Sequence, residues 1–287
     1  MKCLMVGLLL LLISQLLHSQ SITDSILVAT HYRSFSYYKP ANVKGGSLLF
    51  VMHGSGGNSA DMIGHTTKLE AIASREKLLL VYPNGYQHFW NECRLHSTAL
   101  ANKENIDEQV FFNGMIQYFN KKFSINVQKV FAAGFSGGGQ MAYKLGLTMP
   151  DRIKGIAAIV ANMPDSASCD CTLAGKAMPV IIINGTADNV NPYNGGEMFV
   201  SNASFGVVLS AENTFAYWSA LAGYTGAPVK TLLPDTDPTD GKTIESFSYR
   251  QRNKPPVTLL KVVGGKHDYP GDIDVFLYVW NFFKGVK

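Results

Sequence analysis

Short, almost continuous apolar runs alternate along the chain with longer segments in which apolar residues recur at helical spacing. Residues 47–52 and 78–82 are runs of the first kind, and turn residues follow both of them. Between them, residues 60–77 bring Met62, Leu69 and Ile72 onto one face of a helix. Strands that are buried on both faces of a parallel sheet have such unbroken apolar runs. The alternation therefore predicts an α/β protein, with a mostly parallel central sheet and helices on both faces.

The rest of the chain continues this alternation. Further strands are expected over residues 130–133, 156–160, 179–183 and 257–263, and further helices over 106–123, 211–222 and 274–283. Asn105 is a candidate N-cap for the helix at 106–123, whose first turn carries Asp107 and Glu108 and so suits the helix dipole. Residues 31–38 are expected in an antiparallel hairpin at an edge of the sheet. The least regular stretch is 191–256, and its turn-rich part, 234–241, is expected to be a surface loop.

The first twenty residues have the pattern of a secretory leader. Met1-Lys2 gives a basic start, residues 4–17 form an apolar run, and small or polar residues follow. That order is typical of a cleavable signal peptide, and the apolar run is short for a membrane span. An uncleaved anchor helix is the alternative. We therefore expect a signal peptide at 1–20 and a single catalytic domain over 21–287, secreted or periplasmic.

Composition and cysteine usage narrow the classes of partner. The chain has 287 residues, 46% of them hydrophobic, and a net charge of +4 from scattered lysines and arginines. Without a basic cluster, a nucleic-acid surface is not expected.

Removal of the leader would leave Cys93, Cys169 and Cys171, an odd number, so one bridge and one free thiol are expected with the pairing left open. Cys169-Asp-Cys171 is poor spacing for zinc, and no metal site is expected.

The segment Gly134-Phe-Ser-Gly-Gly138 matches the G-x-S-x-G pattern of a nucleophile elbow. A predicted strand, 130–133, precedes it and a segment of helical character follows it, which is the context that the pattern requires. The sharp turn between strand and helix forces the serine into a strained conformation, and glycine neighbours leave room for it. A glycine-rich turn with an incidental serine is the alternative. We predict that Ser136 is a nucleophile.

A serine hydroxyl needs a base, and the base needs an orienting acid. His267 is the only histidine after Ser136, and it follows the predicted strand 257–263 across Gly264-Gly265. Asp188 lies between them in the chain, just beyond the predicted strand 179–183. The order Ser, Asp, His is the one in which this kind of triad occurs after an elbow. We therefore predict a triad of Ser136, Asp188 and His267.

The segment His53-Gly-Ser-Gly-Gly57 follows the predicted strand 47–52 directly. A loop at this place can offer a backbone N–H to the negative charge that develops on a carbonyl oxygen. We assign the two donors of the oxyanion hole to Ser55 and to Gly137, the residue after the nucleophile, with Gly56 as the rival of Ser55. A phosphate-binding loop is not indicated, because the pattern with Gly-Lys-Ser/Thr is absent from the sequence.

With these segments located, the chain resembles the polyhydroxybutyrate depolymerase and feruloyl esterase group of α/β-hydrolases, and it is also similar to acetyl xylan esterases. The motifs that carry the resemblance, besides the elbow, are His53-Gly-Ser-Gly-Gly-Asn58, Val81-Tyr-Pro-Asn-Gly85 with Trp90-Asn91, Asn184-Gly-Thr-Ala-Asp-Asn-Val-Asn-Pro-Tyr-Asn-Gly-Gly196 and Gly264-Gly-Lys-His-Asp-Tyr-Pro-Gly271. The resemblance implies the α/β-hydrolase fold and ester hydrolysis without a metal or organic cofactor. It also implies that Trp90 binds substrate, although packing of this aromatic loop on the core is an equal alternative. Asp268-Tyr269 departs from the usual residues after the histidine, which puts the choice of substrate in doubt.

The sequence thus predicts a secreted serine esterase that acts on a small or polymer-linked ester, such as feruloyl or acetyl esters of plant polysaccharide or hydroxyalkanoate esters. No nucleic-acid partner is expected, and no stable membrane association once the leader is removed. A serine peptidase or an acyltransferase on the same fold would use the same triad. A polymer-binding protein without catalysis is a further alternative, from a different class.

Overall fold

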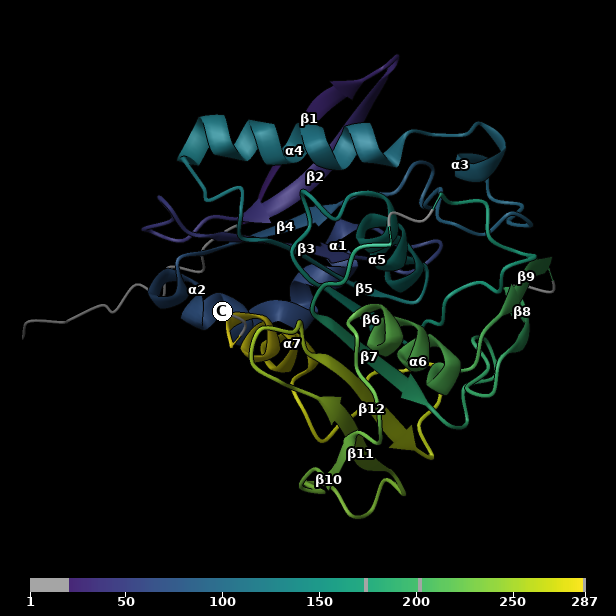
Figure 1. The fold of residues 1–287 in the computed structure, drawn as a ribbon. Coiled ribbons are helices and arrows are strands. Elements are labelled where there is room, and N and C mark those ends of the chain that lie inside the picture. Colours follow the sequence, from purple (N-terminus) through teal and green to yellow (C-terminus); the bar gives the residue numbers. More distant parts are fainter. Residues whose placement is uncertain (1–20, 173–174, 201–202, 286–287) are drawn as a thin grey trace, which may run out of the picture.

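The computed structural model describes residues 21–172, 175–200 and 203–285, and the described chain is built around a ten-stranded sheet (Figure 1). Its strands follow the order β1-β2-β4-β3-β5-β6-β7-β12-β11-β10. The six central strands are parallel, and an antiparallel hairpin extends the sheet at each edge. The central strands are β4 (Leu78–Pro83), β3 (Ser47–Met52), β5 (Val130–Phe135), β6 (Ile156–Ile159), β7 (Val180–Gly185) and β12 (Val257–Val263). The edge strands are β1 (Ile22–Val28) and β2 (His31–Tyr38) on one side, β10 (Val229–Leu232) and β11 (Thr243–Tyr249) on the other.

Helices cover both faces of the sheet, as the alternating pattern predicted. One face carries α1 (Ser59–Ile63), the 3-10 turn η1 (Gly64–Thr66), α2 (Thr67–Glu76) and α7 (Val275–Lys284); the other carries α4 (Glu108–Phe123), α5 (Gly137–Thr148) and α6 (Ala211–Leu221). Successive side chains of β3 point to opposite faces, so Leu48 and Phe50 pack into one core while Leu49 and Val51 pack into the other. All six residues of β3 are buried, which is why its sequence is an unbroken apolar run. This arrangement is the α/β-hydrolase fold, and the predicted fold class is confirmed.

Two predicted helices differ from the structure, one by a break in its middle and the other at its first residues. The helix expected over 60–77 is divided into α1, η1 and α2. At the break, the Thr66 hydroxyl donates to the carbonyl oxygen of Ile63 (3.0 Å) and pairs with the Tyr82 hydroxyl (2.7 Å). Such side-chain bonds compete with the regular hydrogen bonds of a helix. The N-cap of α4 is Asp107, whose carboxylate accepts from the Val110 N–H (3.0 Å). Asn105, the expected cap, has a φ of +48° and lies outside the helix.

The stretch 191–256, which is irregular in sequence, contains two hairpins that the pattern did not reveal. One is β8 (Gly196–Val200) with β9 (Ala203–Val208), and the other is β10 with β11. All four residues of β10 are exposed, so this strand lacks the apolar face that would have indicated it. The expected surface loop at 234–241 connects β10 to β11, and the expected helix corresponds to α6. The short helix α3 (Leu100–Lys103) was also unpredicted.

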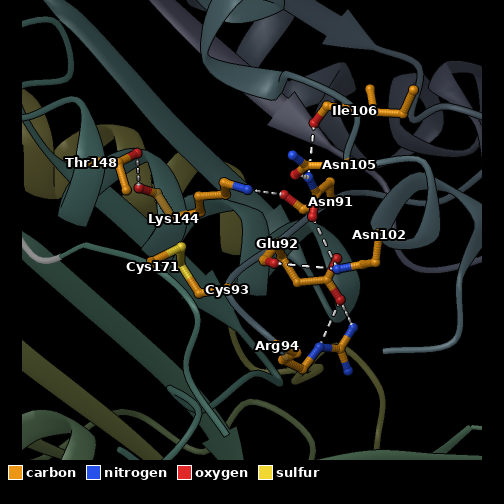
Figure 2. Close-up of a disulfide and its surroundings, with 10 residues drawn as sticks. All are labelled: Asn91, Glu92, Cys93, Arg94, Asn102, Asn105, Ile106, Lys144, Thr148 and Cys171. Carbon is orange, nitrogen blue, oxygen red and sulfur yellow. Dashed lines mark hydrogen bonds and ion pairs between the residues drawn. A yellow bond between two sulfur atoms is a disulfide. The ribbon is translucent and has the colours of Figure 1, made fainter. Parts of the chain in front are cut away.

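Cys93 and Cys171 form a disulfide across 78 residues of sequence (Figure 2). Cys169 is a free thiol. One bridge and one free thiol were expected, and the structure supplies the pairing that the sequence left open. The bridge joins the long loop after β4 to the segment between β6 and β7.

Buried polar contacts join the same long loop to α5 and to the segment before α4, and one buried ion pair lies within the loop (Figure 2). The Lys144 ammonium on α5 donates to the carbonyl oxygen of Asn91 (2.5 Å), and the Asn91 amide donates to the carbonyl oxygen of Ile106 (2.9 Å). Arg94 pairs with Glu92, and both side chains are almost fully buried. Such pairs are costly to break, because one charge would remain buried without its partner. The loop after β4 is therefore fixed at several points.

The predicted signal peptide, residues 1–20, lies outside the described residues, and the extent of a single domain over 21–287 stays a prediction. Within the part of the chain that the structure describes, none of the helices combines the length and the apolar character needed to cross a bilayer.

Loss of the disulfide is expected to destabilise the fold measurably. Closing a loop of this length by a disulfide removes conformational entropy from the unfolded chain, and the stabilisation is about 4 kcal/mol in the chain-entropy description. The double variant Cys93→Ala/Cys171→Ala should therefore lose about that much free energy of unfolding in urea. Cys169→Ala is the matched control and should change it much less. A loss below about 1 kcal/mol in the double variant would contradict this expectation.

Candidate active site

Three polar side chains meet just beyond the carboxyl ends of β5, β7 and β12. The Ser136 hydroxyl oxygen lies 2.9 Å from Nε2 of His267, although the two residues are 131 positions apart in the chain. Nδ1 of His267 lies 2.8 Å from Oδ2 of Asp188. Parallel strands end at the same edge of a sheet, and this common edge brings the three groups together. The structure thus places the three predicted triad residues in one hydrogen-bonded chain.

The turn at Ser136 is strained and closely packed. Ser136 has a φ of +52° and a ψ of −118°, and its N–H donates to the carbonyl oxygen of Ile159 (2.8 Å). A Cβ on Gly134 would lie 2.0 Å from the carbonyl oxygen of Gly138, and a Cβ on Gly138 would lie 2.4 Å from that of Met52. Both glycines of the elbow are therefore required by close backbone approach. A non-glycine residue at positive φ costs free energy, so its surroundings must hold it there.

The Asp188 carboxylate is buried and fully engaged. Its Oδ1 accepts from the backbone N–H groups of Val190 and Asn191, each at 2.8 Å, and its Oδ2 faces His267. Because a carboxylate accepts, Nδ1 of His267 must carry the hydrogen, and Nε2 is left as an acceptor for the Ser136 hydroxyl. This tautomer is the one that a general base needs. The His267 side chain remains 18% exposed, so it can be reached from solvent.

A network of three buried asparagines supports the loop that carries Asp188. The Asn191 side-chain oxygen accepts from the Asn162 N–H (3.1 Å), and the Asn162 amide donates to the carbonyl oxygen of Pro192 (3.0 Å). The Asn184 amide at the end of β7 donates to Asn162 Oδ1 (2.5 Å). These bonds join the ends of β6 and β7 to the acid loop. Sequence reasoning did not assign them a role, although Asn184 and Asn191 stand within a motif that it singled out.

The loop after β3 lies against the amino end of α5. A Cβ on Gly137 would lie only 3.0 Å from the backbone nitrogen of Ser55, so the two predicted donor residues are close neighbours. The N–H of Gly56, the rival of Ser55, already donates to the carbonyl oxygen of His88 (2.9 Å). Gly137 is the first residue of α5, where backbone N–H groups have no partner within the helix. The geometry favours Ser55 over Gly56 as the first donor.

His53 is fully buried beneath this loop. Its Nδ1 lies 2.7 Å from the carbonyl oxygen of Gly54, and its Nε2 accepts from the Gly85 N–H at 2.9 Å. Burial lowers the pKa of His53 from its ordinary value of 6.5 to about 4. The ring is therefore neutral near neutral pH, and it ties the loop after β3 to the loop after β4.

Trp90, the expected substrate-binding residue, is only 1% exposed. Its ring packs on the His53 ring with centroids 4.8 Å apart, and its indole N–H donates to the carbonyl oxygen of His53 (2.9 Å). These contacts agree with the alternative that the sequence left open, in which the aromatic loop packs on the core. Trp90 supports the loop of Ser55 and does not face an open cleft.

The two residues after His267 have partners of their own. The Asp268 carboxylate pairs with the Lys242 ammonium at 3.1 Å. The Tyr269 ring packs on Phe135, the residue before the nucleophile, with centroids 4.5 Å apart. The departure from the usual family residues therefore changes the surroundings of Ser136 through Tyr269 more than through the extra carboxylate.

Comparison with known proteins agrees with the geometry. The model of the phospholipase/carboxylesterase family matches residues 40–204. NocK of Nocardia uniformis subsp. tsuyamanensis is 29% identical over 174 residues, which cover 59% of this chain and 49% of NocK. Feruloyl esterase B of Piromyces equi is 27% identical over 165 residues, which cover 56% of this chain and 29% of that protein. The chain thus spans about half or less of the length of these relatives. The predicted resemblance to feruloyl esterases is confirmed.

Among solved structures, an acetyl xylan esterase from Aspergillus awamori superposes with a TM-score of 0.58 at 13% identity. The match covers 91% of this chain and 99% of that one. At so low an identity the match concerns the fold, and it confirms the α/β architecture over nearly the whole described chain.

The buried His53 predicts a specific dependence of stability on pH. Between pH 6.5 and pH 4 the ring becomes protonated in the unfolded chain but stays neutral in the fold, so its contribution is present above pH 6.5 and is lost as pH falls toward 4. Wild type should therefore lose roughly 3 kcal/mol more free energy of unfolding between pH 7 and pH 4 than the variant His53→Gln does. Urea titrations at several pH values measure it. A difference independent of pH would mean that His53 is not buried as a neutral ring.

Proposed function

The chain belongs to the phospholipase/carboxylesterase family, and from this premise we propose that it is a serine esterase whose catalytic residues are Ser136, His267 and Asp188. The observation that carries the proposal is the hydrogen-bonded chain from Asp188 through His267 to the Ser136 hydroxyl. A serine hydroxyl is a weak nucleophile until a base takes its proton. The imidazole is oriented for that task, because its other nitrogen is held by a buried carboxylate.

The proposed reaction proceeds through an acyl-enzyme. As Oγ of Ser136 attacks the carbonyl carbon of the ester, Nε2 of His267 takes the hydroxyl proton. The N–H groups of Ser55 and Gly137 donate to the oxygen that becomes negatively charged. His267 then gives its proton to the departing alkoxide, the bond between the acyl carbon and the alcohol oxygen breaks, and the acyl group stays on Ser136.

Water completes the cycle by the same route. His267 removes a proton from a water molecule that attacks the acyl carbon, the two N–H groups again hold the oxyanion, and the protonated imidazole returns a proton to Ser136 Oγ as the acid leaves. Asp188 stabilises the imidazolium that forms in each half-reaction. The asparagine network around Asn162 positions this carboxylate and acts only through it.

For the substrate we propose feruloyl or acetyl esters of plant polysaccharide, or hydroxyalkanoate esters. The similarity to feruloyl esterase B supports the first of these. We further propose that the protein is exported. The leader-like pattern of residues 1–20 and the Cys93–Cys171 disulfide support an oxidising compartment.

Removal of the nucleophile should abolish ester hydrolysis. Ser136→Ala is expected to lower kcat for p-nitrophenyl acetate roughly a millionfold, and His267→Ala should have a similar effect. The double variant should be no worse than either single one, because the residues act as a unit. Steady-state and burst kinetics with purified protein give these values.

Ser25→Ala, at an exposed position of β1, is the matched control and should keep full activity. Ordinary turnover by Ser136→Ala would contradict the assignment. Labelling of wild type by a fluorophosphonate, and its loss in Ser136→Ala, tests the nucleophile independently of any substrate. A panel of feruloyl, acetyl-sugar and hydroxyalkanoate esters beside matched amides then separates an esterase from a peptidase.

A further inference from the structure

A cavity of about 730 Å³ lies at the edge of the sheet opposite the proposed catalytic centre, and its size is in the range of small-molecule sites. Its walls come from residues 250–256 between β11 and β12, from Pro179 ahead of β7, from Lys154 ahead of β6 and from Gly285 after α7. These segments stand at the amino ends of parallel strands, whereas the proposed catalytic residues follow the carboxyl ends. The cavity is therefore a separate place, and binding there does not depend on the proposed function.

Four side chains in these walls carry a positive charge, and no acidic residue is among the walls that the structure describes. The four are Lys154, Arg250, Arg252 and Lys254. Within the described ranges of the chain, none of them takes part in an ion pair. Lys154 donates to a backbone carbonyl oxygen at 2.8 Å, and Lys254 also donates to one, so neither charge is neutralised. The fold thus gathers cations that are scattered along the sequence.

The acid beside this group is already engaged. The Asp151 carboxylate binds the Lys176 ammonium at 2.6 Å, and the charges of Lys154 and Arg152 also lower the pKa of this carboxyl. Together with the three cations of residues 250–254, six positive charges surround one negative charge. The whole chain has a net charge of only +4, so this region is a concentration of its positive charge. A concave surface with such a field attracts anions.

The same walls also offer apolar surface. Ala177 and Pro255 are half-buried, and Pro179 and Pro256 adjoin them. A small inorganic anion would leave this surface unused, whereas a ring with C–H groups would cover it. The arginine guanidinium has a planar fork of N–H groups that matches a carboxylate. The lining therefore suits a ring that bears a carboxylate.

We propose that this cavity binds an oligouronide, a short chain of sugar rings that each bear a carboxylate. The carboxylates pair with Arg250, Arg252 and the two lysines, and the ring faces lie on the prolines. A cavity of about 150 Å³ is enough to hold benzene, and a pyranose ring is of similar size. There is therefore room for more than one sugar unit.

Calorimetric titration with trigalacturonate tests the proposal, with maltotriose and tripolyphosphate as comparison probes. At low salt, wild type should bind trigalacturonate with a dissociation constant of about 1 mM or tighter. Maltotriose, which has no carboxylates, should bind at least about tenfold more weakly. Binding of trigalacturonate should weaken as salt is raised, because exposed charges are screened.

Three results would overturn the proposal. They are no binding of trigalacturonate at several millimolar, equal binding of maltotriose, and binding of tripolyphosphate at least as tight as that of trigalacturonate. The last result would mean that the site recognises charge without the sugar ring. All of these titrations are read without an ester substrate, so a protein without esterase activity would refute the proposed function and leave this test unaffected.

Variants of Arg252 locate the site. This residue is exposed and makes no hydrogen bond or ion pair within the described chain, so Arg252→Glu should fold normally. It should weaken trigalacturonate about tenfold, since one attraction becomes a repulsion. Arg252→Lys keeps the charge and should retain binding within about threefold.

Lys103→Glu is the matched control, because it makes the same change of charge at an exposed position. Lys103 is on α3, well away from the C-terminal end of the chain that borders the cavity (Figure 1). It should leave binding unchanged, and circular dichroism melts check that each variant folds. Binding that survives in Arg252→Glu, or that falls equally in Arg252→Glu and Lys103→Glu, would reject the site.

Discussion

The common direction of β5, β7 and β12 is the constraint on which the candidate active site depends. Each strand ends at the same edge of the sheet and delivers one polar group beyond its last residue: Ser136, Asp188 and His267. If one of these strands ran the other way, its group would lie at the opposite edge, and no rotation of a side chain could restore the contact. The apolar strand residues that hold this alignment are therefore as necessary to the site as the groups that they present.

A strained turn and buried polar groups are stable here because they support one another. The left-handed backbone of Ser136 is held by its N–H bond to Ile159 and by glycines that admit the neighbouring strand. His53 and the asparagine network are buried, yet their bonds run between loops that would otherwise be independent. Rigid loops are what preorganised hydrogen-bond donors require, since donors that must reorganise during the reaction stabilise charge less. The close packing of the loops, the strained turn at Ser136 and the proposed chemistry therefore depend on one another.

Features that follow from short-range pattern were predictable from the sequence, and features that depend on distant partners were not. The unbroken apolar run of β3 and the strand–turn–helix around Ser136 indicated their structures directly. The division of the helix at Thr66 depends on Tyr82, which is sixteen residues away. The exposed strand β10 has no apolar face, so only its pairing with β11 defines it. The sequence left the environment of Trp90 open between substrate binding and core packing, because its burial depends on His53, which is distant in the chain.

The strand β10 has a consequence for the behaviour of the molecule in concentrated solution. It is the last strand of the sheet on its side, and Val229 and Leu232 are each 67% exposed, so its free backbone edge could recruit a second sheet. Lys230 stands between them and is held at the edge by a 2.7 Å bond to Glu245. Charged side chains, lysine above all, are a common means by which exposed edge strands avoid pairing with another sheet. Lys230 is the residue of this kind on β10.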